Sequence, residues 1–492
     1  MKHLYYVNII VFLTGLSAYA QLPASHEGYV EVSGMAASSV RTPFWLRANQ
    51  FGTVPLSAPA GTGRAGIRGR MLLTDTTKQR ARKPWTVSYG AELVGNAGRD
   101  NQLLAPEYFV SLTHRQIQLT AGRRREVIGL VDTTLSSGSY AWSGNALPLP
   151  KIQFGTRGFA PLGRRQWLAI NAFIAHGLFA NTDYMQHSFL HQKSIILRVG
   201  KPTSAVRVYG GINHSVQWGG HSDYLDYHYA VNGQLPGQLR DFPNVLFAIR
   251  MGGLNNPRIT SFDYVNLYGN HVGSIDLGME LRLASVQLML YHQHSFDDAS
   301  GMFFQNAPDG LSGLRIRPLK RGAASFHIDA LLLEFLSTLH QSGPSFYQAN
   351  THTKGADNYF NNGQYAEGWT YNDRVIGTPF ITRKQDLSPA NQSNTKWTIN
   401  NNRLQMAHVG LSATLAQRIS CLAKVSYSQN HGVPGEPLPG TPSQWSSLLQ
   451  LQTPVSWMGG MTLTAAVAAD VGELYSNSIG GSIGLRKTVW RK

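Results

Sequence analysis

Short amphipathic strands that repeat along almost the whole chain are the feature that most constrains its fold. Segments bounded by clusters of Gly, Pro, Asn or Asp predict seventeen strands. They cover residues 63–74, 83–95, 104–113, 115–122, 151–160, 166–176, 186–199, 202–218, 271–281, 284–294, 311–318, 325–340, 403–418, 420–432, 444–457, 459–470 and 478–490. The chain is therefore predicted to be all-β.

The pattern within single strands indicates what kind of β protein this is. In residues 274–283 the apolar set is Ile275, Leu277, Met279, Leu281 and Leu283, and the polar set between them is Asp276, Gly278, Glu280 and Arg282. A strand that separates lipid from an aqueous lumen alternates in this way. A soluble β-sandwich or propeller also alternates, but it requires neither a secretion signal nor unequal loops.

The connections between the strands fall into two sets of different length. Long segments occur near 123–150, 219–270, 295–310, 341–402 and 432–443, and short ones near 75–82, 161–165, 199–203, 319–324 and 456–460. Long loops outside and short turns in the periplasm are typical of bacterial transmembrane barrels, which close with an even number of strands. Because seventeen is odd, we expect one more strand near the N-terminus or within 123–150, and about 18 in total.

The N-terminus carries an export signal. Residues 1–20 have a basic start, an apolar stretch and small residues at Ala18 and Ala20, which predicts Sec cleavage before Gln21. We expect residues 21–62 to plug the barrel from the periplasmic side or to form its first strand, and residues 63–492 to form a transmembrane β-barrel in the bacterial outer membrane.

The charge and the cysteine count limit the partners and the chemistry. The net charge is +16, but export excludes nucleic acid as the partner. The anions available are lipopolysaccharide and acidic surface polysaccharide. A single cysteine, Cys421, excludes an intramolecular disulfide and a thiolate metal cluster. The chain has no recognised hydrolase or phosphate-loop motif, so we expect no enzymatic activity, cofactor or metal.

The longest loop, 341–402, is the first candidate binding site. Its aromatic side chains Tyr365, Trp369 and Tyr371 stand near Asp357 and Asn358. Sugars pack their C–H faces on rings and bond their hydroxyls to amides and carboxylates, so this composition favours polysaccharide. The alternative is a lid whose aromatics form a small core of their own.

Two further clusters are candidates. Gln217 and Trp218 end a strand, and there Trp218 is either a sugar-stacking ring or an interfacial girdle residue. His292 and His294 share a strand face near Asp297, Asp298 and Asp309, which in principle suits Ca²⁺. The spacing is not that of an EF-hand, and turn formation by Asp and Gly explains the same residues.

Several segments, taken in order, resemble the capsule-assembly Wzi family. They are residues 42–52 (TPFWLRANQFG), 214–220 (HSVQWGG), 268–273 (YGNHVG), 291–294 leading to Asp298, Gly301 and 309–311, and 357–359 through 368–371 to 375–380. The chain departs from the enterobacterial branch because only residues 21–62 precede the clear strands, with no long helical region.

The resemblance implies an 18-stranded barrel that acts as a lectin and attaches capsular polysaccharide to the cell surface. The ligand-binding residues would be Gln217, Trp218, Asp357, Asn358, Tyr365, Trp369 and Tyr371. We expect a monomer in contact with lipopolysaccharide and outer-membrane lipid. The competing functions are a diffusion channel for oligosaccharides, which requires an open lumen, and an outer-membrane enzyme, which requires a nucleophile close to a base.

Overall fold

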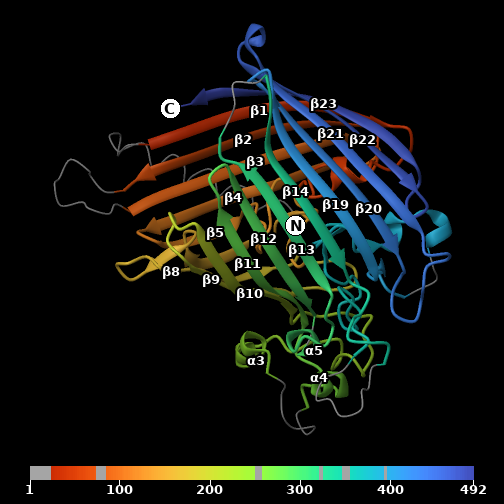
Figure 1. Ribbon diagram of the computed structural model, residues 1–492. Helices are drawn as coiled ribbons and strands as arrows, with labels where there is room; N and C mark the ends of the chain where they lie inside the picture. Colours follow the sequence, from red (N-terminus) through yellow and green to blue (C-terminus); the bar gives the residue numbers. More distant parts are fainter. Residues whose placement is uncertain are drawn as a thin grey trace, which may run out of the picture.

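The strands close into one antiparallel barrel (Figure 1). The computed structural model describes residues 24–73, 85–249, 257–297, 299–320, 325–345, 355–392 and 396–491. The predicted signal peptide, the whole 75–82 turn and Asp298 lie outside these residues. No helix in the described ranges is both long enough and apolar enough to cross a membrane.

The barrel wall has eighteen strands. The sheet contains nineteen strand segments, but β6 and β7 both pair with β8 and form one interrupted strand. The wall strands are β1 Ala24–Ala37, β2 Ala60–Leu72, β3 Trp85–Gly98, β4 Gln102–His114, β5 Ile117–Arg123, β6 Lys151–Thr156, β7 Ala160–Leu162, β8 Leu168–Leu178, β9 Phe189–Val199, β10 Val206–Trp218, β11 Asn270–Arg282, β12 Val286–Phe296, β13 Gly310–Pro318, β14 Phe326–Ser337, β19 Leu404–Leu415, β20 Ile419–Asn430, β21 Ser443–Val455, β22 Met461–Gly472 and β23 Ser478–Arg491.

The remaining elements are short and lie in the connections. They are α2 Phe44–Arg47, α3 Phe242–Phe247, α4 Ser261–Val265, α5 Ala299–Met302, the 3₁₀ helices η2 Leu239–Asp241, η3 Lys384–Asp386, η4 Pro389–Asn391 and η5 Ser456–Met458, and the small strands β15 Thr370–Tyr371, β16 Arg374–Val375, β17 Thr382–Arg383 and β18 Ile399–Asn401. Helices α3, α4 and α5 gather at one end of the barrel, and the C-terminus lies at the other (Figure 1).

The extra strand that the even count required is β1, close to the N-terminus. It closes the barrel by pairing with β23, from Glu27 opposite Arg491 to Ala37 opposite Gly480. Because β1 runs antiparallel to β23, residues 38–59 leave it at the end that bears the long connections, which we call the loop end. These residues therefore enter the lumen from the loop end and not from the periplasmic side.

The predicted alternation of faces is confirmed. In β11, Leu277 is 55% exposed on the outer surface, whereas Asp276 is 0% exposed. In β10, Val206 and Val208 are exposed on the outer surface, and the next residue, Tyr209, is buried towards the lumen. The outer surface therefore offers aliphatic side chains to lipid, and the polar face points inwards.

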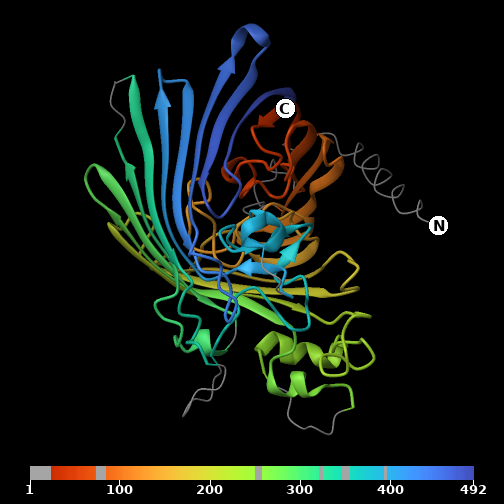
Figure 2. The same cartoon turned by 90° about the vertical axis from the view of Figure 1, so that its right-hand side faces the viewer.

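Three long segments occupy the lumen. Residues 38–59, 124–150 and 355–392 begin at the loop end, but most of their side chains are buried inside the wall. Figure 2 shows the last of these segments, in cyan, between the walls of the barrel. The loops predicted at 123–150 and 341–402 thus start on the predicted side but turn inwards, because their aromatic side chains are buried there.

The segments 38–59, 124–150 and 355–392 together form what we call the plug, and carboxylates on the wall hold the first two in place. Glu334 of β14 accepts hydrogen bonds from Ser136 Oγ (2.7 Å) and Ser137 N (2.6 Å). Asp276 of β11 accepts one from Leu130 N (2.6 Å), and Asp470 of β22 accepts one from Phe44 N (2.7 Å). Charged lumen residues are therefore paired with the plug, as in Glu92 with Arg125 at 2.5 Å. They are also paired between wall strands, as in Glu92 with Arg64 at 3.6 Å.

The plug predicts that the barrel conducts few ions. In planar bilayers we expect little or no steady conductance, because the three segments obstruct the lumen. Glu334→Ala should raise the conductance, since loss of a buried acceptor costs about 1–3 kcal/mol and frees the 124–150 segment. The exposed substitution Tyr227→Ala is the control. Large, stable channels formed by the unaltered folded protein would contradict an obstructed lumen.

Candidate functional site

Three of the four aromatic residues predicted as sugar-stacking surfaces lie in the 355–392 segment and are buried. Trp369 is 0% exposed, and Tyr365 and Tyr371 are also buried. The indole of Trp369 donates to Ala141 O (2.9 Å) and packs edge-on against Trp142 and Phe179. Trp369 and Tyr371 belong to the core of the plug, the alternative that the sequence left open. Tyr365 packs instead with Met185 and Leu235 and donates to Gly219 O (3.0 Å), so none of the three rings presents an open face to a sugar.

Gln217 and Trp218 lie on opposite faces of the wall. The Gln217 amide points to the lumen side and donates to Ser188 Oγ (3.1 Å). Trp218 lies an even number of positions after Val206 and Val208 along β10, so its side chain points outwards as theirs do. There it is buried beneath α3. The structure therefore does not bring Trp218 together with Trp369.

The remaining two predicted residues, Asp357 and Asn358, line an open groove. This mouth groove lies at the loop end between residues 228–229, 261–271, 355–363 and 397, and its volume is about 650 Å³. These ranges belong to the β10–β11 and β14–β19 connections, and Asp297 and Pro434 add one residue from each of two others. It combines rings with amides in one recess.

The chemistry of the mouth groove is the aromatic and amide combination that the sequence predicted, but with other residues. Its rings are Tyr229, Phe262 and Trp397, all partly exposed, and its amides are Asn266, Asn270, Asn358, Asn361 and Asn362. The Tyr229 and Phe262 rings stand 5.2 Å apart and tilted by 55°. On the Trp397 ring, the Lys396 ammonium lies 4.7 Å from the centre.

One amide of the groove is unusual. Asn270, the first residue of β11, is 3% exposed, and its Nδ2 has no hydrogen-bond partner among the described residues. Buried donors in folded proteins are almost always paired. The Nδ2 atom is itself shielded from solvent, so a ligand oxygen or a water molecule would reach it only after the amide turns towards the groove.

Hydrogen bonds within one connection and between two connections fix the shape of the groove. Asn358 Oδ1 accepts from Asn402 Nδ2 (2.6 Å) and Asn361 Nδ2 (2.9 Å). Gln364 Nε2 donates to Asp263 (2.8 Å), which ties the plug to α4. Burial raises the pKa of the Asp263 carboxyl, although hydrogen bonds from Thr260 and Gln364 oppose the shift. The two sides of the groove are thus joined before any ligand arrives.

The groove carries little charge in spite of the basic chain. Among its described lining residues there is no Lys or Arg, and the carboxylates are Asp297 and Asp357. Asp297 accepts from Tyr140 OH (2.8 Å) and Phe360 N (2.6 Å), and Asp357 from Ser342 Oγ (2.7 Å). Because both carboxylates already accept protein donors, hydrogen bonding and ring contact, and not ion pairing, dominate the lining.

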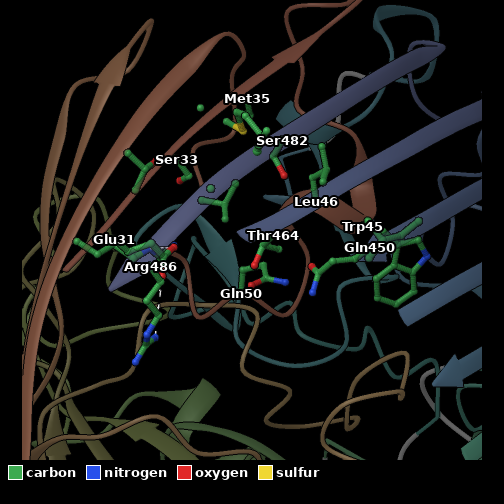
Figure 3. Close-up of a pocket in the computed structure, with 17 residues that line it drawn as sticks. Glu31, Ser33, Met35, Trp45, Leu46, Gln50, Gln450, Thr464, Ser482 and Arg486 are labelled. Atoms are coloured by element: carbon green, nitrogen blue, oxygen red, sulfur yellow. Dashed lines mark ion pairs between the residues drawn. The ribbon is translucent and has the colours of Figure 1, made fainter. Parts of the chain in front are cut away.

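A second cavity lies deeper in the lumen and is much smaller. It has a volume of about 160 Å³ and separates α2 and the residues after it from β1, β22 and β23. Figure 3 shows Gln50, Gln450 and Thr464 on one side and the ion pair of Glu31 with Arg486 on another. Liquid water occupies about 30 Å³ per molecule, so this space suits a few waters and not a polymer.

The residues considered for Ca²⁺ serve the local structure. His292 bonds Ser312 Oγ (2.9 Å), and Asp309 accepts from His340 N and Gln341 N. No three His, Cys, Asp or Glu side chains in the described ranges are placed to hold a metal ion. Asp298 lies outside those ranges.

Sequence reasoning missed the rings of the groove and Asn270. Tyr229, Phe262 and Asn270 belong to or adjoin the 219–270 loop, and Trp397 belongs to the 341–402 loop. The clustering of aromatics with amides, which the sequence shows in the loop, also occurs in the lining of the groove. It could not separate rings that turn into the plug from rings that remain at the mouth, since both kinds occur in one loop.

Comparison with known proteins places the chain in a family. The family model for capsule assembly protein Wzi matches residues 73–388, more than half of the chain. A solved structure from Escherichia coli, Wzi, shares 13% identity over 93% of this chain and 84% of its own, with a TM-score of 0.57. It is described as an outer-membrane protein involved in group 1 capsule assembly and as a carbohydrate-binding β-barrel.

Other solved barrels are more distant. OccK5 from Pseudomonas aeruginosa covers 95% of this chain and 98% of its own at 8% identity and a TM-score of 0.45. OccAB4 from Acinetobacter baumannii covers 96% and 100% at 10% identity and a TM-score of 0.48. No curated protein matches the chain. The family match and the closed eighteen-stranded wall agree with each other, and the chain belongs to the Wzi family of capsule assembly proteins as an outer-membrane β-barrel.

Proposed function

We propose that this protein binds capsular or other surface polysaccharide in the mouth groove and so helps to assemble or attach the capsule. Support comes from the family, from the carbohydrate binding described for E. coli Wzi, and from the chemistry of the groove. The observation that carries the proposal is the combination of partly exposed rings and amides in this groove. Asn270, which lines the same space, holds a buried donor without a partner among the described residues.

The groove suits a chain of sugars in two ways. Half-exposed rings cover the C–H faces of a pyranose, and each such contact contributes on the order of 1 kcal/mol beyond area burial. Amide groups both donate and accept, as sugar hydroxyls do. Because the walls are already joined by hydrogen bonds, little ordering is needed when the ligand binds.

The competing functions have less support. A diffusion channel would need the segments 38–59, 124–150 and 355–392 to leave the lumen. Wall carboxylates hold the first two, and the Trp369 indole bonds the third to Ala141 O of the second. For an enzyme, the two groove carboxylates would have to act on substrate, but both already accept protein donors. We therefore propose a binding role without catalysis, carried out by a monomer in contact with lipopolysaccharide.

The Asn270 amide gives the sharpest test. Asn270→Ala should weaken polysaccharide binding about fivefold, because a neutral hydrogen bond is worth about 1 kcal/mol. It should not lower the thermal stability, since Nδ2 makes no bond in the free protein. The measurement is binding of purified surface polysaccharide by calorimetry, together with a heat-modifiability gel for the folded barrel.

Asn213 is the matched control for Asn270. It is equally buried at 3%, but it bonds Ser194 and Ser274 inside the wall. Asn213→Ala should therefore lower stability and leave binding unchanged. Equal binding by the Asn270→Ala protein and the unaltered protein would remove this amide from the site.

The groove rings provide an independent test. Cells that carry Tyr229→Ala together with Trp397→Ala should shed capsule into the medium, because two ring contacts of about 1 kcal/mol each are lost. The amount of folded barrel in their outer membrane should stay normal. Tyr224→Ala is the control, since Tyr224 is 68% exposed in the same loop and does not line the groove. Trp369→Ala should act differently and destabilise the plug, as buried Trp to Ala substitutions cost about 3–5 kcal/mol.

Salt distinguishes this mechanism from attraction by net charge. Binding in the groove should change little between low salt and 0.5 M NaCl, because its described lining has no Lys or Arg. Attraction by the net charge of +16 would be lost over the same range, because added salt shortens the Debye length. Lys396→Gln, which removes the cation over Trp397, is the control variant and should leave the titration unchanged.

A further inference from the structure

Two connections at the loop end fold outwards over the wall instead of inwards into the plug. In β10, Val216 and Trp218 have the same parity as the lipid-facing Val206 and Val208, yet they are 0% and 3% exposed. They are covered by Phe242 and Val245 of α3 and by Ile259 and Tyr268. Figure 2 shows this segment, in yellow-green, on the far side of the strands from the cyan plug.

The first outward segment covers polar side chains on the lipid side of the wall. His191 and Lys193 of β9 share the face of the exposed Ile195. The Phe242 ring stands 5.2 Å from the His191 ring and perpendicular to it, and Lys193 Nζ donates to Leu246 O at the end of α3. Polar and charged groups facing hydrocarbon are costly, so α3 separates them from lipid.

The second outward segment does the same on β12. His294 shares the face of Leu290, which is exposed to lipid. Its Nε2 bonds Gly301 O in α5 (2.9 Å), and the Phe304 ring stacks on it at 4.5 Å. Residues 299–304 therefore lie against the outside of the wall.

Both segments present large apolar side chains away from the barrel. On the first, Leu239 is 87% exposed and Phe247 is 67% exposed; on the second, Phe303 is 69% exposed. Neighbouring apolar side chains add to this surface, namely Ile249, Met302 and Phe304. Exposed apolar patches of this kind mark contact with protein or membrane.

We propose that these two segments form an outer collar, residues 239–249 and 299–304, that lies in the interfacial layer of the membrane leaflet at the loop end. The occupant is lipid, because the collar is continuous with the lipid-facing band of the same strands, Ile195 and Leu197 in β9 and Leu277 in β11. Arg240, exposed beside Leu239, would lie among anionic head groups.

The collar also explains how one wall of the mouth groove is held. The connection that supplies Phe242 to the collar continues to Phe262 and Asn266 in the groove. A segment anchored in the membrane on the outside is thus joined through Gln364 and Asp263 to the plug on the inside. The collar proposal rests on the wall contacts and holds whether or not the groove binds polysaccharide.

Spin labels test the collar directly. Leu239→Cys, Phe247→Cys and Phe303→Cys, each in a Cys421→Ala background, would be labelled and inserted in liposomes of phosphatidylcholine and phosphatidylglycerol. Collision with oxygen should exceed collision with a water-soluble nickel chelate at all three positions, as it should at the lipid-facing control Leu277→Cys. Tyr227→Cys, 80% exposed in the same loop, should show the reverse.

Two outcomes would overturn the proposal. Nickel collision at the three collar positions as frequent as at position 227 would place the collar in water. Dipolar broadening between labels, with protection from both agents, would assign the surface to a second copy of the chain. A photo-crosslinking residue at Leu239, which needs no cysteine substitution, should yield lipid adducts, and protein adducts alone would contradict the collar.

Discussion

Closure of the wall by the β1–β23 ladder is the interaction on which the rest of the structure depends. A strand edge inside a bilayer leaves backbone groups unpaired, and each unpaired group costs several kcal/mol. The eleven residue pairs from Glu27–Arg491 to Ala37–Gly480 remove that edge. Closure with eighteen strands creates a wide lumen, and the lumen must then be filled or left as a channel.

The polar inner face determines how the lumen is filled. Asp276, Glu334 and Asp470 point inwards because their strands alternate, and buried carboxylates require donors. Backbone N–H groups of the 124–150 segment and of α2 supply them. The aromatic side chains of the same segments pack against one another between these anchors, as in the pairs Trp142–Trp369 and Phe44–Phe380. The plug is therefore both bonded to the wall and apolar at its centre.

The loop end divides the long connections between three environments. Residues 38–59, 124–150 and much of 355–392 turn into the lumen, whereas α3 and α5 turn over the outside of the wall. Between them remains the mouth groove, with the rings and amides that neither the plug nor the collar uses. The proposed binding surface is thus what the two folding directions leave open.

The sequence by itself determined the barrel. Period-two alternation, turn clusters and loop lengths predicted the strands, the even count and the chemistry of rings beside amides, because these depend on neighbours along the chain. Only the tertiary structure decided that Trp369 lies in the plug, that Trp218 lies beneath α3, and that Tyr229, Trp397 and Asn270 meet at the mouth. Those positions depend on contacts between each loop and wall residues that are distant in the sequence. The pattern of residues along the chain does not specify such contacts.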